Sequence, residues 1–258
     1  MNTTHEESLN AIGRLLGIMD DLREKCPWDK KQTLSSLRTL TIEETYELAD
    51  AILEDNLEEI RKELGDLLLH IVFYSKIGSE KNAFDFASVA HGICDKLIDR
   101  HPHIYGDVQV ADEAEVKRNW EQLKLKEGKK SVLEGVPNGL PAMVKSQRIQ
   151  EKAAGIGFDW ETSEQVLEKV KEEWGEFAEE VTHNDTEKME EEFGDLLFSL
   201  INYARFLKIN PENALEITNK KFIKRFQYLE KCASKATKSL SEMTLDEMNT
   251  YWEEAKKL

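Results

Sequence analysis

The chain carries one helical pattern twice, and this duplication constrains its fold more than any other feature. The segment "ELGDLLLHIVFYSKI" (63–77) returns 129 positions later as "EFGDLLFSLINYARF" (192–206). Further matches are "TIEETYELADAI" (41–52) with "VKEEWGEFAEEV" (170–181), "KLIDR" (96–100) with "KFIKR" (221–225), and "NWEQLK" (119–124) with "YWEEAK" (251–256). Chance does not produce four ordered matches, so we predict two copies of one folding unit.

The apolar residues of both copies recur at helical spacing, and the period-two alternation typical of strands is hard to find. This pattern predicts an all-α protein made of two tandem helical bundle domains. The stretch "GKKSVLEGVPNGLP" (128–141) breaks the periodicity with three glycines and two prolines. We therefore predict a linker at 127–141 between domains at 1–126 and 142–258.

Composition excludes several classes of function. A formal net charge of -16 disfavours binding to nucleic acid, which depends on lysine and arginine contacting phosphates. No apolar run approaches the roughly 18 residues that a membrane span requires. Three cysteines without a CxxC spacing argue against a disulfide framework or a zinc site. We expect a cytoplasmic protein that contacts neither nucleic acid nor membrane.

Each copy carries an EExxE motif and, sixteen residues after its last glutamate, an ExxD motif. These are Glu43, Glu44, Glu47, Glu63 and Asp66, then Glu172, Glu173, Glu176, Glu192 and Asp195. A lone EExxE in so acidic a chain is usually a solvated helix face. Projected at about 100° per residue, however, all of these residues except Glu43 and Glu172 border the apolar stripe of their helix. An antiparallel hairpin would gather four carboxylates per copy at the rim of a core, where they need a cation.

The chemistry of this set indicates which cation. All the repeated ligands are carboxylate oxygens, which suit Mg²⁺ or Mn²⁺ better than zinc or copper. Diiron carboxylate bundles use Glu-x-x-His, whereas His70 of the first copy has Ser199 as its counterpart. A magnesium site of this kind leaves positions for water and substrate phosphates. Phosphate chemistry is therefore the leading hypothesis.

Basic and aromatic residues also recur. Lys96 and Arg100 match Lys221 and Arg225, four apart on one helix face, where they could clamp a phosphate or form surface ion pairs. Trp120 matches Trp252. This tryptophan could stack on a base, or it could serve packing alone.

The motifs "CPWDK", "IEETYE", "ELGDLL", "DRHPH" and "GFDW" stand in the order of a two-domain MazG protein. The chain thus resembles the MazG nucleoside triphosphate pyrophosphohydrolases of the all-α NTP pyrophosphatase superfamily. The resemblance implies hydrolysis of nucleoside triphosphates, ATP included and broadly for NTPs and dNTPs, to the monophosphate and diphosphate. It also implies dependence on Mg²⁺, with Mn²⁺ as a substitute, and a homodimer.

The resemblance also assigns residues. Metal ligands would be Glu173, Glu176, Glu192 and Asp195, with Glu44, Glu47, Glu63 and Asp66 as their N-terminal counterparts. Nucleotide contacts would come from Lys169, Val170, Lys171, Glu172, Glu173, Lys188, Met189, Glu190, Glu191, Asp195, Lys221, Phe222, Ile223, Lys224, Arg225 and Trp252. Glu172, turned away from the metal face, either orients the attacking water as a catalytic residue or only contacts the nucleotide.

The two copies differ in cations beside the carboxylates. Lys169 and Lys188 correspond to Leu40 and Glu59, so we expect the C-terminal copy to do most of the hydrolysis. Gly194, within the second ExxD helix, would let a neighbouring helix or a ligand approach closely, or serve packing alone. Two other functions remain open, a catalytically silent dimerisation or regulatory module and a diiron-type oxidoreductase.

Overall fold

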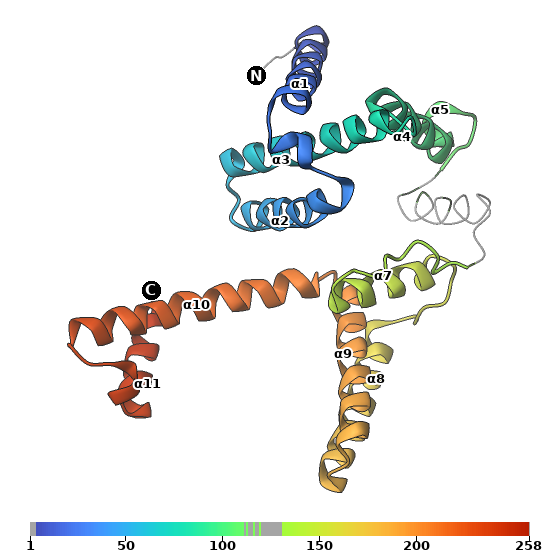
Figure 1. Cartoon of the computed structure of the whole chain (residues 1–258). Coiled ribbons are helices and arrows are strands. Elements are labelled where there is room, and N and C mark those ends of the chain that lie inside the picture. Colours follow the sequence, from blue (N-terminus) through green and yellow to red (C-terminus); the bar gives the residue numbers. More distant parts are fainter. Residues whose placement is uncertain (1–3, 111, 113–115, 117–118, 120–130, 258) are drawn as a thin grey trace. The chain divides into compact units, whose positions relative to one another are not determined.

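The computed structural model describes residues 4–110, 112, 116, 119 and 131–257, and within these ranges every regular element is a helix. The all-α prediction is thereby confirmed. The chain divides into two compact units, Met1–Val110 and Ala111–Leu258 (Figure 1). In the described part of the chain, no helix has the length and apolar character that a membrane crossing needs.

Unit 1 consists of α1 (His5–Lys25), α2 (Leu34–Leu53), α3 (Leu57–Glu80), α4 (Phe86–Arg100) and the short α5 (Pro102–Tyr105), with a 3-10 turn at Asp29–Lys31. Polar side chains start these helices, because the first N–H groups of a helix lack partners within it. Thr33 accepts a hydrogen bond from the backbone N–H of Ser36 at the start of α2, and Asn56 caps α3 in the same way.

The core of unit 1 lies where α1 and α2 pack on α3. Met19, Leu37, Val72, Phe73 and Ile77 are buried there together. Such packing of an apolar stripe provides most of a helix's stability in a folded protein. A polar network crosses the α2–α3 interface, where Thr41 Oγ1 lies 2.8 Å from His70 Nδ1 and 2.7 Å from the Tyr74 hydroxyl. The network fixes the pairing of the two helices beside their acidic residues.

Unit 2 consists of α7 (Ala142–Ala154), α8 (Ser163–His183), α9 (Thr186–Phe206), α10 (Pro211–Lys235) and α11 (Leu245–Ala255), with a 3-10 turn at Leu240–Glu242. The helices α8 and α9 form a hairpin whose turn places Asn184 in the left-handed conformation, at φ 57°, which asparagine tolerates better than most residues. The α7 helix packs on α9. Val166, Leu196 and Ile201 are buried in this unit.

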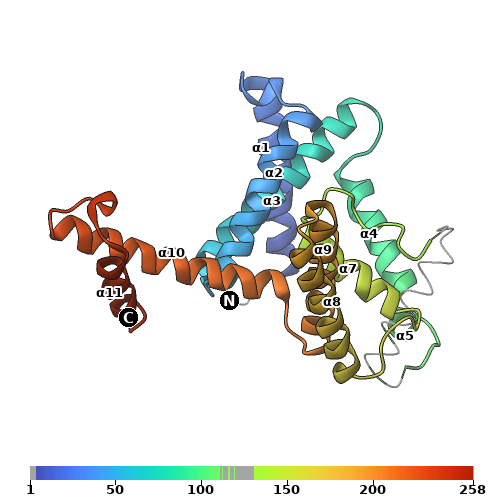
Figure 2. The ribbon, with the colours of Figure 1, turned by 90° about the horizontal axis from the view of Figure 1, so that it is seen from below.

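The last two helices of unit 2 form a separate pair. Figures 1 and 2 show α10 leading away from the α8–α9 hairpin and α11 folding back against α10. Leu229 and Ala233 of α10 and Ala255 of α11 are buried in this pair. By contrast, Phe222 and Ile223 on α10 are exposed.

The described part of the predicted linker contains turns but no helix. It is held against α7, because Lys152 Nζ donates to the Val132 carbonyl at 3.1 Å and Lys145 Nζ donates to the Asn138 carbonyl at 2.7 Å. Residues 127–130 lie outside the described ranges. The domain bounds at 126 and 142 stay a prediction.

Candidate metal and nucleotide site

The acidic residues of unit 2 meet on the α8–α9 hairpin. Glu173 and Glu176 lie one turn apart on α8, and Glu192 lies on the antiparallel α9. One carboxylate oxygen from each of the three lies within 4.8 Å of the others. The helical hairpin thus brings together, on two helices, side chains that are up to 19 positions apart in sequence.

Unit 1 repeats this group on the α2–α3 hairpin. There Glu44, Glu63 and Asp66 offer oxygens within the same 4.8 Å. Glu47 and Asp195, the fourth member of each predicted set, stand outside the two groups but act on the pKa of their neighbours. Each of the four predicted ligand positions is therefore part of the acidic group in unit 1, in unit 2 or in both.

Among the described residues, the charges that act on the pKa of Glu44 in unit 1 are carboxylates alone. Burial raises the pKa of Glu44, and the nearby carboxylates of Asp66, Glu47, Glu63 and Glu43 raise it further. The pKa of Glu63 is raised by desolvation first and then by Glu47 and Asp66. A pKa raised by neighbouring carboxylates shows that their negative charges repel one another, and a bound divalent cation would relieve this repulsion.

Unit 2 has the same repulsion, but Lys169 partly neutralises it. Desolvation and the neighbouring carboxylates raise the pKa of Glu176 and of Glu192. Lys169 Nζ lies 2.8 Å from both Glu172 and Glu173, and these hydrogen bonds hold the pKa of the lysine well above its usual range. Unit 1 has Leu40 at the equivalent position.

The donor set fits a hard divalent cation. Among the described residues, the two groups that could hold a metal ion consist of carboxylates alone, without histidine or cysteine. Such oxygen ligands suit Mg²⁺, Mn²⁺ and Ca²⁺ rather than zinc or copper. His70 lies inside unit 1 and is bound to Thr41.

Most of the other predicted nucleotide contacts lie on the same α8–α9 hairpin. Val170, Lys171 and Glu172 are on α8, and Lys188, Met189, Glu190 and Glu191 are on the first turns of α9. Lys171 pairs with Glu168 at 2.7 Å, and Lys188 lies 3.8 Å from Glu180. Glu172 is exposed and bound to Lys169, beside the metal group rather than in it.

The remaining predicted contacts lie on α10 and α11. The "KFIKR" segment (221–225) is on α10 and Trp252 on α11, on the pair that leads away from the α8–α9 hairpin (Figure 2). Trp252 packs against Phe222, with ring centroids 5.0 Å apart, and the Arg225 guanidinium lies 6.0 Å from its ring. Trp120, the counterpart of Trp252, lies outside the described residues.

The prediction that Gly194 admits a neighbouring helix is wrong for the described structure. A Cβ built at Gly194, or at its copy Gly65, meets no atom within 4 Å. The close approach occurs instead at Gly78, where an added Cβ would lie 2.6 Å from the ring of Phe84. The position of a glycine in a helical pattern therefore does not identify the segment that packs against it.

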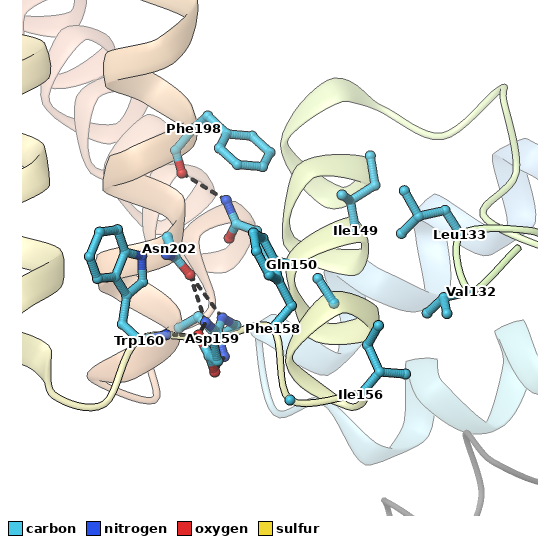
Figure 3. Close-up of a pocket in the computed structure, with 13 residues that line it drawn as sticks. Val132, Leu133, Ile149, Gln150, Ile156, Phe158, Asp159, Trp160, Phe198 and Asn202 are labelled. Atoms are coloured by element: carbon cyan, nitrogen blue, oxygen red, sulfur yellow. Dashed lines mark hydrogen bonds and ion pairs between the residues drawn. The ribbon is translucent and has the colours of Figure 1, made fainter.

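A cavity lies between α7, the 156–160 loop and α9 (Figure 3). Its volume is about 670 Å³, and its walls include Gln150, Phe158, Trp160 and Phe198. The "GFDW" motif marked this loop as part of the family pattern. No sequence signal pointed to Gln150.

The fold and the site define a class of all-α protein in which duplicated helical hairpins each carry an acidic group made of carboxylates alone. The family model for the MazG nucleotide pyrophosphohydrolase domain matches the chain twice, at residues 32–105 and 161–229. The chain therefore belongs to the MazG family, and its two copies are two MazG domains. The resemblance inferred from the motifs is confirmed.

Full-length relatives agree with this assignment. The nucleoside triphosphate pyrophosphohydrolase of Escherichia coli K12 is 40% identical over 258 residues, covering 96% of this chain and 98% of that protein. The MazG pyrophosphohydrolase/pyrophosphatase of Thermotoga maritima is 43% identical and covers 94% of each chain. An uncharacterised Bacillus subtilis protein, YabN, is 46% identical over 90% of this chain but extends beyond it, since the match covers 48% of its length.

Proposed function

We propose that the protein is a Mg²⁺-dependent nucleoside triphosphate pyrophosphohydrolase, which converts NTPs and dNTPs, ATP included, to the monophosphate and diphosphate. The observation that carries the proposal is the oxygen-only carboxylate group repeated in both hairpins. Support comes from the E. coli and T. maritima relatives, whose names state this activity. The same family membership disfavours a diiron oxidoreductase and a catalytically silent module.

In unit 2 the metal would be held by Glu173, Glu176, Glu192 and Asp195. Their mutual repulsion, visible in the raised pKa of Glu176 and Glu192, makes cation binding favourable. When bound, Mg²⁺ or Mn²⁺ supplies charge neutralisation for the triphosphate and a lowered pKa for a coordinated water. In unit 1 the equivalent ligands are Glu44, Glu47, Glu63 and Asp66.

The chain's own residues would prepare the substrate. Lys169 bridges Glu172 and Glu173, so a bound triphosphate would give this lysine a third anionic partner beside the metal group. Lys171 and Lys188 add positive charge along the same hairpin. Glu172, exposed next to the group, would accept a hydrogen bond from the attacking water.

The C-terminal unit would do most of the hydrolysis. Unit 1 has Leu40 where unit 2 has Lys169, and Glu59 where unit 2 has Lys188. The Glu59 carboxylate forms an ion pair with Lys62 Nζ at 2.6 Å. With fewer cations beside its carboxylates, the first site neutralises a triphosphate less well.

The site would be completed in a homodimer. Lys221, Lys224 and Arg225 lie on α10, which leads away from its own acidic hairpin (Figure 1). Apolar side chains are exposed on both elements, including Phe222 on α10 and Trp174 on α8. A second copy whose α10 covers the α8–α9 hairpin would bury both apolar faces and bring basic residues to an acidic site.

Subunit mixing tests this arrangement. Glu192→Ala and Arg225→Ala are each expected to lose activity as pure proteins. If α10 acts on the partner's hairpin, the mixed dimer contains one site free of both substitutions, and random mixing restores about a quarter of wild-type activity. If α10 acted on its own hairpin, mixing would restore nothing.

The chemical proposal is tested by metal titration. Diphosphate release from NTPs should stop in EDTA and return with Mg²⁺ or Mn²⁺. Release that continues without divalent metal would contradict it. The cytoplasmic location remains part of the proposal, supported by the three unpaired cysteines.

A further inference from the structure

Unit 2 holds a cation of its own against its acidic group. Lys169 Nζ lies 2.8 Å from Glu173 Oε1, and Glu173 shares the group with Glu176 and Glu192 on the α8–α9 hairpin. The lysine therefore supplies part of the positive charge that these carboxylates need. Unit 1 has Leu40 at the same position, and Leu40 packs against the core of that unit.

The two partners of this ion pair differ in their freedom to move. The Glu173 side chain is 9% exposed, whereas that of Lys169 is 34% exposed and has a flexible stem. Lys169 also has a second partner, because its Nζ lies 2.8 Å from Glu172, whose side chain is 58% exposed. Release of Glu173 therefore requires only that the lysine swing toward Glu172 and solvent, while the buried carboxylate stays in place.

A lysine in this position opposes metal binding at the group. Its charge would lie about 5 Å from a divalent cation held by Glu173, where repulsion weakens binding about tenfold even at the dielectric constant of water. The ion pair between Lys169 and Glu173 must also be broken before the carboxylate can act as a ligand. Lys169 and a metal ion thus compete for the same charge.

The acidic group of unit 1 has no such competitor among the described residues. Lys62 acts on Glu63, but it forms its ion pair with Glu59, which lies outside the group of Glu44, Glu63 and Asp66. The unit 1 group can therefore accept a divalent cation without losing an ion pair.

The other lysines of the α8–α9 hairpin differ from Lys169 in their partners. Lys171 pairs with Glu168 at 2.7 Å, and Lys188 lies 3.8 Å from Glu180. Neither glutamate belongs to the acidic group. A triphosphate that attracts all three lysines would therefore release a carboxylate of the group only through Lys169.

We propose that Lys169 makes metal binding in unit 2 depend on the nucleotide. Without a nucleotide, Lys169 holds Glu173 and keeps the affinity for free divalent cations low. A bound triphosphate takes the lysine away from Glu173, and the released carboxylate completes the metal group. Unit 1, with Leu40, binds a free divalent cation more tightly. The part played by the triphosphate rests on the proposed function, whereas the competition between Lys169 and a metal ion does not.

Binding of Mn²⁺ without nucleotide measures this competition, through the EPR signal of the unbound ion. Full-length Glu63→Gln, in which the unit 1 group is weakened, reports unit 2, and Glu192→Gln reports unit 1. Adding Lys169→Met to Glu63→Gln should tighten Mn²⁺ binding about tenfold, to a level near that of Glu192→Gln. Unchanged or weaker binding after Lys169→Met would overturn the proposal. Binding by Glu192→Gln as weak as that by Glu63→Gln would overturn the contrast between the units.

Two matched variants, made in the same Glu63→Gln protein, separate this role from general charge and from structure. Lys171→Met removes the same charge from the same helix and should change Mn²⁺ affinity less than about twofold, because solvent and salt screen this exposed side chain. Lys169→Arg retains the charge and should keep Mn²⁺ binding weak. Equal tightening by Lys171→Met and Lys169→Met would overturn the role of Lys169. Loss of structure does not imitate the predicted gain of affinity, and Lys169→Gln repeats the charge change if Lys169→Met fails to fold.

Turnover separates failure of this inference from failure of the proposed function. Lys169→Met should reach half its maximal rate at about tenfold lower free Mg²⁺, yet its KM for ATP should rise about tenfold, the value of one hydrogen bond to a charged group. A purely structural defect does not move these two constants in opposite directions. An unchanged Mg²⁺ requirement in an active protein would overturn the inference alone. Tighter Mn²⁺ binding by Lys169→Met in a protein whose wild type hydrolyses no NTP would overturn the proposed function and the part of the triphosphate.

Discussion

Glu44→Gln and Glu173→Gln change equivalent residues, yet we expect the first to stabilise the metal-free protein and the second to leave its stability nearly unchanged. Glu44 lies within 4.8 Å of Glu63 and Asp66, and the charges that act on its pKa are all carboxylates. Glu173 lies 2.8 Å from Lys169. The same isosteric change therefore removes only repulsion in unit 1, whereas in unit 2 it removes both the repulsion from Glu176 and Glu192 and an ion pair.

The expected magnitudes follow from these distances. Two like charges about 5 Å apart cost roughly 1 kcal/mol at the dielectric constant of water. Glu44 has two such neighbours and is half-buried, so its neutral amide should raise the free energy of unfolding by about 1–2 kcal/mol. Glu173 and Lys169 have side-chain exposures of 9% and 34%. Losing this pair costs about 1 kcal/mol, but relief of the repulsion from Glu176 and Glu192 offsets it, so the free energy of unfolding of Glu173→Gln should stay within about 1 kcal/mol of wild type.

The effect at Glu44 depends on pH. Its pKa in the folded protein is raised above the ordinary value of 4.5, so the folded state is relieved of repulsion below pH 4.5 and loses that stability as pH rises through the folded pKa. The advantage of Glu44→Gln should vanish near pH 4.5 and reach its full size near neutral pH.

Thermal unfolding followed by circular dichroism in EDTA, at pH 4.5 and 7.5, measures the effect. Hydrogen exchange of peptides from α2–α3 and from α8–α9 assigns it to a unit. Added Mg²⁺ should stabilise the α2–α3 hairpin of wild type more than that of Glu44→Gln. Lower stability of Glu44→Gln than wild type in EDTA at pH 7.5, or equal stabilisation by the two variants, would contradict this expectation.

Three further predictions follow from the site and the fold. Glu192→Ala should abolish NTP turnover while Glu63→Ala leaves much of it, and the reverse ranking of initial rates would show that unit 1 is the main site. Gly78→Ala should lower the free energy of unfolding by about 1–3 kcal/mol, because its Cβ meets the Phe84 ring at 2.6 Å. The control Gly65→Ala, with open space around its Cβ, should raise it by up to about 1 kcal/mol. Equal denaturant midpoints for the two glycine variants would contradict this account.

The helices and the acidic groups could be predicted from sequence because both depend on local periodicity. Projection on a helical wheel placed Glu44, Glu63 and Glu192 beside the apolar stripes, and the hairpins bring these residues into the two groups. The duplication gave a second, independent copy of the pattern. Without it, the acidic motif would have had the same appearance as a solvated helix face.

Other features depend on packing between distant segments and left no periodic signal. The hydrogen bond from Gln150 to Phe198 joins residues 48 positions apart, and nothing in the sequence near either residue indicates it. A family motif places "KFIKR" (221–225) and Trp252 beside the nucleotide, but it does not state which copy of the chain contributes them. The space around Gly194 likewise depends on elements remote in sequence.

In the proposed reaction, the carboxylates of unit 2 support attack of water on the α-phosphoryl group of an NTP. Hydrolysis of ATP in ¹⁸O-labelled water with Mg²⁺, followed by ³¹P NMR, tests it most directly. We predict AMP carrying the label together with unlabelled diphosphate, and neither product from Glu192→Ala. Formation of ADP and labelled orthophosphate, or equal turnover by Glu192→Ala, would contradict the claim.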